Sequence, residues 1–211
     1  MRRASIWAVV AAGALACPAL AADLDVQVRG PDGKPVRDAV VTVRLIGRAT
    51  PAAKPAGTYA IDQQGIQFHP FVTVVPAGAS IMFMNHDDVR HHVYSFAPAK
   101  TFQLKLEKRA QNSAVTFDKP GIVPLGCNIH DRMIAYVAVV DTPWARISDA
   151  SGHVLLRALP AGAVEISVWH PYLRSPGNRV TRNANVSDAA PASEQIAVTL
   201  RPPPRMPESG Y

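Results

Sequence analysis

Hydrophobic and polar residues alternate in short runs along most of this chain, and turn-forming residues separate the runs. Leu24, Val26 and Val28 alternate with polar residues, and residues 71–75, 80–84 and 92–96 form similar short runs. Clusters rich in Gly, Pro, Asn and Asp stand between them. This pattern predicts β-strands joined by tight turns. We therefore expect an all-β chain made of sandwiches, with no long helix.

The same pattern predicts further strands and two segments without a core. The additional strands cover residues 39–46, 111–117, 134–140, 144–147, 154–159, 164–169 and 196–200, with one more starting near Tyr59. Residues 48–57 are rich in Pro and Ala and are predicted to be a linker. The Pro-rich residues 201–211 are predicted to be a disordered tail. A central domain, residues 58–141, is thus flanked by segments 23–47 and 142–200.

The N-terminus has the layout of a secretory signal peptide. Arg2 and Arg3 precede a run of small and apolar residues that ends in Ala19–Ala22,. We predict that residues 1–22 are cleaved, that the mature protein is periplasmic, and that no membrane span remains. A membrane anchor is a weaker alternative because the apolar run is short. A lipoprotein would use Cys17.

The charge of the chain does not indicate a nucleic-acid partner. The formal net charge of +6 falls to +4 when Arg2 and Arg3 are removed, and the basic residues are scattered except in segment 105–109. Nucleic-acid-binding proteins usually concentrate their positive charge on one surface. Export and scattered charge therefore argue against this class of function.

Cleavage would leave Cys127 as the one cysteine of the mature chain. Structural cysteines of exported proteins normally come in pairs, so a lone one indicates metal ligation, an intermolecular disulfide or a reactive thiol. Cys127, His130 and Met133 form a C-x2-H-x2-M motif directly before a predicted strand. A thiolate, an imidazole and a thioether suit copper, whereas Met is a poor ligand for zinc.

A second histidine must come from elsewhere if the site is a trigonal one with two His, one Cys and a weak axial Met. The best candidates are His91 and His92, which begin a predicted strand. Strand side chains alternate between faces, so one of the two would face the metal, and His92 stays open as an alternative ligand. His69, His86 and His170 are better explained as surface, turn or structural residues.

The segment from about residue 59 to residue 141 resembles a cupredoxin of the plastocyanin/amicyanin group. Pro120-Gly121, five residues and then Cys127 repeat a family spacing, and the short C-x2-H-x2-M loop is most similar to amicyanin. Residues 85–93 match the upstream ligand region. The resemblance implies a Greek-key β-sandwich with one type 1 (blue) copper, bound by His91, Cys127, His130 and Met133.

The chain departs from the cupredoxin pattern around the upstream ligand. Family members commonly have Pro before this His and Asn after it, where this chain has Arg90 and His92. The Asn helps to hold the cysteine loop and tunes the thiolate. Its replacement by His92 therefore bears on the potential and colour of the site, since hydrogen bonds around the ligands set both.

The flanking segments resemble a different module. Residues 23–47 are similar to the opening of carboxypeptidase-regulatory-like or transthyretin-like sandwiches, and residues 144–171 are similar to the closing half. Neither has enough strands for a core, so we expect them to form one small sandwich into which the cupredoxin is inserted. Two independent appendages are the alternative. The whole architecture resembles bacterial proteins labelled "methylamine utilization protein", a label that implies genomic association.

These features together predict a periplasmic one-electron carrier that meets its redox partner proteins transiently and is not an enzyme. One alternative is a copper-binding or copper-delivery protein without an electron-transfer role, with a more open site made of His86, His91, His92 and a Met. A second alternative is an adhesive or scaffolding sandwich. The sequence does not indicate an oligomeric state.

Overall fold

The structure, a computed structural model, describes residues 21–109, 112–187 and 191–203. These residues form sixteen strands in four sheets, together with one short 3-10 helix at Pro176–Asn178. The prediction of an all-β chain is confirmed. The predicted signal peptide lies almost entirely outside the described residues, as does most of the predicted tail. Within the described part, no helix is long and apolar enough to cross a membrane.

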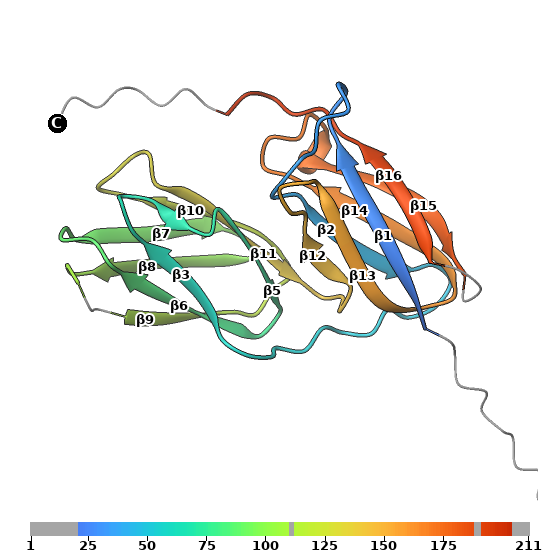
Figure 1. The fold of residues 1–211 in the computed structure, drawn as a ribbon. Helices are drawn as coiled ribbons and strands as arrows, with labels where there is room; N and C mark the ends of the chain where they lie inside the picture. The colour runs from blue at the N-terminus through green and yellow to red at the C-terminus, as the bar shows by residue number, and fades with distance from the viewer. Residues whose placement is uncertain (1–20, 110–111, 188–190, 204–211) are drawn as a thin grey trace, which may run out of the picture.

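Strands from the two ends of the chain form one sandwich, which we name the terminal sandwich. Its sheets have the orders β13-β1-β16 and β12-β2-β14-β15 (Figure 1). Its strands are β1 (Ala21–Arg29), β2 (Val40–Leu45), β12 (Ala145–Ile147), β13 (His153–Pro160), β14 (Gly162–Trp169), β15 (Arg179–Val186) and β16 (Ala192–Ala197). The inward residues of both sheets share one core, with Leu24, Val41 and Ile166 fully buried. That these segments belong to a carboxypeptidase-regulatory-like module stays a prediction.

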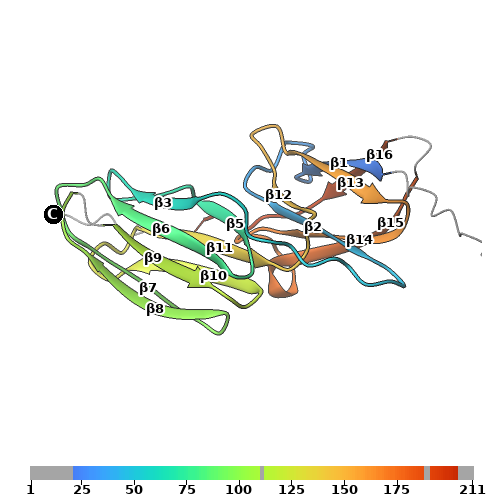
Figure 2. The same ribbon diagram turned by 90° about the horizontal axis from the view of Figure 1, so that it is seen from below.

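The middle of the chain forms a second sandwich, which we name the central sandwich. Its sheets have the orders β5-β11-β10-β7-β8 and β4-β3-β6-β9. Its strands are β3 (Tyr59–Gln63), β4 (Phe68–His69), β5 (Val72–Pro76), β6 (Ala79–Asn85), β7 (His91–Ala97), β8 (Lys100–Leu106), β9 (Asn112–Phe117), β10 (Gly121–Cys127) and β11 (Ile134–Val140). Figure 2 shows the two sandwiches lying end to end, with the layers of each seen from below.

The alternation seen in the sequence places the core of the central sandwich. In β6, Ile81 and Phe83 are fully buried, whereas Met82 between them is 39% exposed. The ring of Phe102 meets those of Phe83 and Phe117. Burying a side chain of this size contributes about 2–3 kcal/mol relative to leaving it in water. This core is the rigid support from which the ends of β7 and β10 present their side chains.

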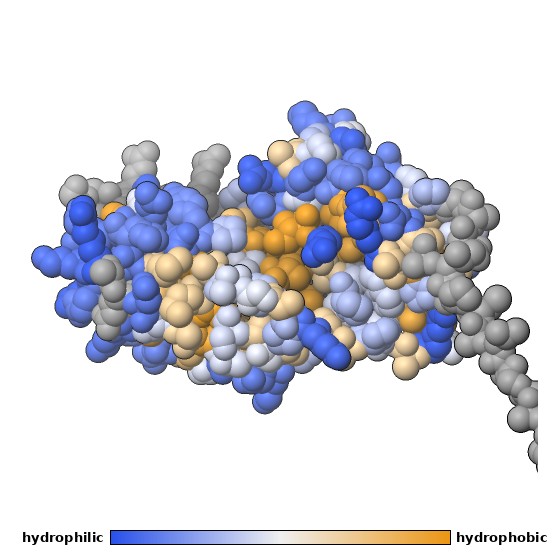
Figure 3. Space-filling model, turned by 60° about the horizontal axis from the view of Figure 1, so that its bottom comes forward, coloured by the Kyte–Doolittle hydropathy of each residue, from blue (hydrophilic) through white to orange (hydrophobic). Residues whose placement is uncertain are grey.

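A third, smaller apolar cluster joins the two sandwiches. Val72 and Ala138, from the outer face of the five-stranded sheet, are buried together with Val40 and Trp169 of the terminal sandwich. The rings of Tyr136 and Trp169 meet edge to face, with centroids 5.7 Å apart. On the face seen in Figure 3, hydrophobic residues gather in the middle of the molecule, between more hydrophilic surface on either side. Strand β11, which directly follows the C-x2-H-x2-M motif, is therefore packed on both faces.

The strand predictions were incomplete and one was displaced. The sequence reasoning did not predict β4, β8, β10 or β15, and the strand expected at residues 196–200 lies at Ala192–Ala197. Strand β15 is mostly exposed along its length, and β10 contains a Pro and two Gly. In β10, Val123, Leu125 and Cys127 are buried at alternate positions, but the Pro and Gly between them are rare in strands and hide the signal,. The positions of β15 and β10 are set by pairing with β14 and β11, which are strongly apolar.

Candidate metal centre

Two neighbouring strands bring Cys127 and His91 together. Cys127 is the last residue of β10 and His91 is the first residue of β7. These strands pair antiparallel, and Cys127 lies opposite Val93. The loop from β10 to β11 then turns back, because the Met133 N–H donates to the His130 carbonyl at 3.0 Å. Residues far apart in the sequence therefore meet at one end of the sandwich.

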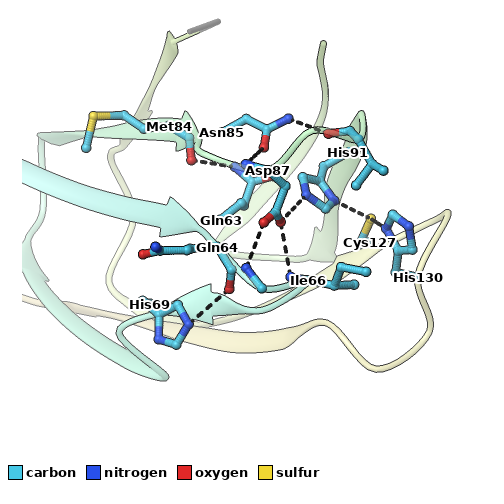
Figure 4. A network of polar contacts seen from close by, with 12 residues as sticks. Gln63, Gln64, Ile66, His69, Met84, Asn85, Asp87, His91, Cys127 and His130 are labelled. Atoms are coloured by element: carbon cyan, nitrogen blue, oxygen red, sulfur yellow. Dashed lines mark hydrogen bonds and ion pairs between the residues drawn. The ribbon is translucent and has the colours of Figure 1, made fainter. Parts of the chain in front are cut away.

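The nearest atoms of the three residues have the spacing of metal ligands. Cys127 Sγ lies 3.9 Å from His91 Nδ1 and 3.7 Å from His130 Nδ1 (Figure 4). The ligand atoms of all three residues lie within 4.8 Å of one another. Typical metal bonds of about 2.0 Å to nitrogen and 2.3 Å to sulfur place N and S about 3.8 Å apart in a trigonal arrangement. These residues, which we name the Cys127 triad, thus fit one metal ion.

The three members of the triad differ in how deeply they are buried. His91 is 1% exposed and Cys127 is 4% exposed, whereas His130 is only partly buried. Burial lowers the pKa of His130, and the neighbouring His91 lowers it further against a weaker opposite effect of Asp87. The lowered pKa favours the neutral imidazole, which is the form that binds metal. His130 is therefore the member through which the triad reaches solvent.

Met133 lies close to the triad in the chain and in the core. It is 1% exposed and belongs to the same apolar cluster as Cys127. Its main chain is tied to His130 by the hydrogen bond described above. The role of Met133 as a fourth, axial ligand stays a prediction.

Asp87 is the functional residue that the sequence reasoning missed. Its Oδ2 lies 2.9 Å from His91 Nε2, on the side of the ring away from Cys127. The carboxylate also accepts the N–H groups of Gly65 at 2.7 Å and Ile66 at 3.1 Å. Burial raises the pKa of Asp87, but the bonds from His91 and the two N–H groups outweigh it, so the net pKa is lowered. An ionised Asp87 holds the proton of His91 on Nε2 and leaves Nδ1 free for a metal.

Two further features shape this network. Asn85 is buried, accepts the Asp87 N–H at 2.9 Å, and donates to the carbonyls of Val89 at 2.8 Å and Glu107 at 2.9 Å. Ile66 has φ of 56°, a left-handed conformation that is rare for a β-branched residue. The turn after β3 is thus held in a strained form in which two successive N–H groups point at Asp87. The one signal in the sequence that could have indicated Asp87 is a carboxylate four residues before His91.

His92 follows His91 in β7, and successive strand side chains lie on opposite faces of the sheet,. It is half-buried and lines a small pocket of about 280 Å³ together with His91, Arg90 and Lys105. Its carbonyl accepts the Asn128 N–H at 2.9 Å. The loop after Cys127 is therefore tied to β7 through the main chain of His92, at the position where cupredoxins commonly have Asn.

The remaining histidines of the described chain stand apart from the triad. His86 Nε2 lies 3.3 Å from Asp62 Oδ1, and His69 Nε2 lies 3.2 Å from the Gln64 carbonyl. His153 Nε2 lies 2.7 Å from Asp25 Oδ2 in the terminal sandwich. His170 is buried, and its Nδ1 accepts the Tyr172 N–H at 3.2 Å.

Comparisons with known proteins assign no family to the chain. No protein-family model and no curated protein matches it. Among solved structures it is similar to a purple cupredoxin from Nitrosopumilus maritimus, with 20% identity over 39% of this chain and 99% of that protein, at a TM-score of 0.34. An amicyanin from Paracoccus versutus has 18% identity over 47% of this chain and 98% of that protein, at a TM-score of 0.37. A copper-containing nitrite reductase from Thermus scotoductus has 22% identity over 55% of this chain and 28% of that protein, at a TM-score of 0.38. At these TM-scores, any functional assignment depends on the geometry of the site.

Proposed function

We propose that the protein is a periplasmic one-electron carrier with one type 1 copper at the Cys127 triad. The observation that supports this most directly is the spacing of His91 Nδ1, Cys127 Sγ and His130 Nδ1, which suits a trigonal His2Cys site,. Bound copper would supply the Cu(II)/Cu(I) couple. Met133 would be its weak axial ligand, as the C-x2-H-x2-M motif implies.

The protein's own contribution is to hold the ligands in place. His91 and Cys127 end two paired strands, and Asp87 fixes the far side of the His91 ring. The buried core beneath them resists movement, since protein interiors are packed as densely as organic crystals. A site that changes little between oxidation states favours rapid electron exchange. This supports a carrier and not an enzyme.

His130 is the natural contact point for a redox partner. It is the most exposed member of the triad, and its neighbour Ile129 is 37% exposed. Val89 and Ile66, which lie in the segments tied to the triad through Asn85 and Asp87, are 41% and 42% exposed. Exposed apolar side chains in the segments that carry the triad or are tied to it suit a brief encounter, because electron-transfer interfaces are typically small.

The visible and EPR spectra of copper-loaded mature protein test the proposal. We expect a strong thiolate-to-Cu(II) band that disappears on reduction, is lost in Cys127→Ser, and survives in His92→Ala. His92→Ala is the matched control because His92 lies next to His91 in sequence but on the opposite face of the strand,. A weak band with rapid metal exchange in the wild type would instead support the delivery alternative. Loss of the band in both variants would contradict the ligand set.

A further inference from the structure

The outer face of β6 carries a row of side chains that the Cys127 triad does not use. Met82, Met84 and His86 recur at every second residue, and the residues between them, Phe83 and Asn85, are buried, as is Ile81 before them. Side chains two residues apart in a strand share one face. The pairing of β6 with β3 continues to His86, one residue beyond the strand, since the His86 N–H donates to the Gln63 carbonyl at 2.9 Å. The three side chains therefore point outward on one line.

The surroundings of these methionines do not explain them as core residues. Met82 is 39% exposed and lies between Ala60 of β3 and Ala114 of β9, both of which are exposed. Met84 lies between Asp62 and Asn112 in the same two strands. In Figure 4, the side chain of Met84 points away from His91 and Cys127. Small and polar neighbours leave both thioethers accessible.

A carboxylate prepares the histidine at the end of the row. Asp62 Oδ1 lies 3.3 Å from His86 Nε2, and the side chains of Asp62 and His86 are 39% and 51% exposed. A carboxylate in this position holds the ring proton on Nε2 and leaves Nδ1 as a donor atom for a metal. Within the described residues, no hydrogen bond engages His86 Nδ1. The row thus offers two thioether sulfurs and one imidazole nitrogen beside a negative charge.

We propose that Met82, Met84 and His86 form a second, surface-exposed site for Cu(I). Thioether sulfur is a soft ligand that selects Cu(I), and imidazole also suits copper. Zinc and the hard divalent cations are disfavoured because two of the three donors are methionines. The site does not depend on the Cys127 triad. If the proposed function holds, its position suggests a role in loading, since His86 directly precedes Asp87, which holds His91.

The test uses full-length mature protein with Cys127→Ser, so that the triad lacks its thiolate. Cu(I) is added without oxygen in competition with bicinchoninate, and the affinity is compared with that of a Met82→Leu/Met84→Leu double variant. Leucine keeps the volume and removes the sulfur. We expect the double variant to lose at least tenfold in affinity, whereas Met206→Leu, which removes a thioether that belongs to neither site, does not.

A second measurement locates the metal directly. Ag(I), a redox-inert probe for Cu(I) sites, is added to the Cys127→Ser protein labelled with methyl-13C methionine. We expect one equivalent to shift the methyl signals of Met82 and Met84, and His86→Gln to weaken the effect. Unmoved Met82 and Met84 signals, or equal Cu(I) affinity in the double variant, would overturn the proposal. Because Cys127 is absent throughout, these outcomes are independent of whether the wild type shows a type 1 spectrum.

Discussion

Replacing Asp87 with Asn tests how much the hydrogen bonds behind His91 contribute to the metal centre. The Asp87 carboxylate accepts three N–H groups, with His91 and Ile66 on Oδ2 and Gly65 on Oδ1. An Asn side chain has one carbonyl oxygen, so its NH2 group must face at least one of these donors. Gly65 and Ile66 are exposed, so the cost comes from losing one bond and exchanging the others from a charged carboxylate to a neutral amide, which amounts to about 1–3 kcal/mol. We expect the metal-free protein to lose free energy of unfolding in this range.

The same substitution should weaken copper binding more than it changes the fold. Loss of a carboxylate that orients a ligand histidine typically lowers metal affinity about 10–100-fold. Urea unfolding of the metal-free protein and competition titration with Cu(II) measure the two effects separately. Asp88→Asn is the matched control, because Asp88 is exposed and pairs only with Arg109 in the described chain; we expect it to leave both quantities unchanged. Equal behaviour of the two variants would refute the role assigned to Asp87.

Three further predictions concern the free energy of unfolding of the chain. Burial lowers the pKa of His170 to about 4 from 6.5, so between these pH values the unfolded chain binds a proton that the folded chain does not. The destabilising effect of the neutral, buried His170 is absent above about pH 6.5 and grows as the pH falls, to about 3 kcal/mol near pH 4. We expect the free energy of unfolding of His170→Asn, measured with urea, to depend less on pH across this window than that of the wild type. An unchanged slope would contradict the prediction. Ile66→Asn should raise the free energy of unfolding by about 1 kcal/mol, because Asn tolerates the left-handed conformation; a loss of stability would show that the Ile66 side chain packs usefully. Trp169→Ala should lower the free energy of unfolding by about 3–5 kcal/mol, since the ring is buried between the sandwiches,. A smaller loss, measured by chemical denaturation, would show that the contact between the two sandwiches contributes little stability.

The local pattern of the sequence was sufficient for the all-β class and for the nearest neighbours of Cys127. Short apolar or β-branched runs bounded by turn residues identified strands such as β6 and β11, because one or both of their faces are buried. The C-x2-H-x2-M motif placed His130 and Met133 beside Cys127, since residues within one short loop cannot lie far apart. Strand β10 has Pro124 and Gly126 between its buried residues, and β15 is mostly exposed, so neither shows a continuous strand signal.

Only the tertiary structure decided which distant groups meet. The pairing of β7 with β10 placed His91, and not His92, beside Cys127, because successive strand residues face opposite sides. Asp87 gained its role from a turn more than twenty residues earlier, whose two N–H groups hold its carboxylate. The strands of both chain ends share one core, although neither end has enough strands to bury its own apolar face. Contacts across long sequence separations depend on strand register and packing, which a single sequence does not display.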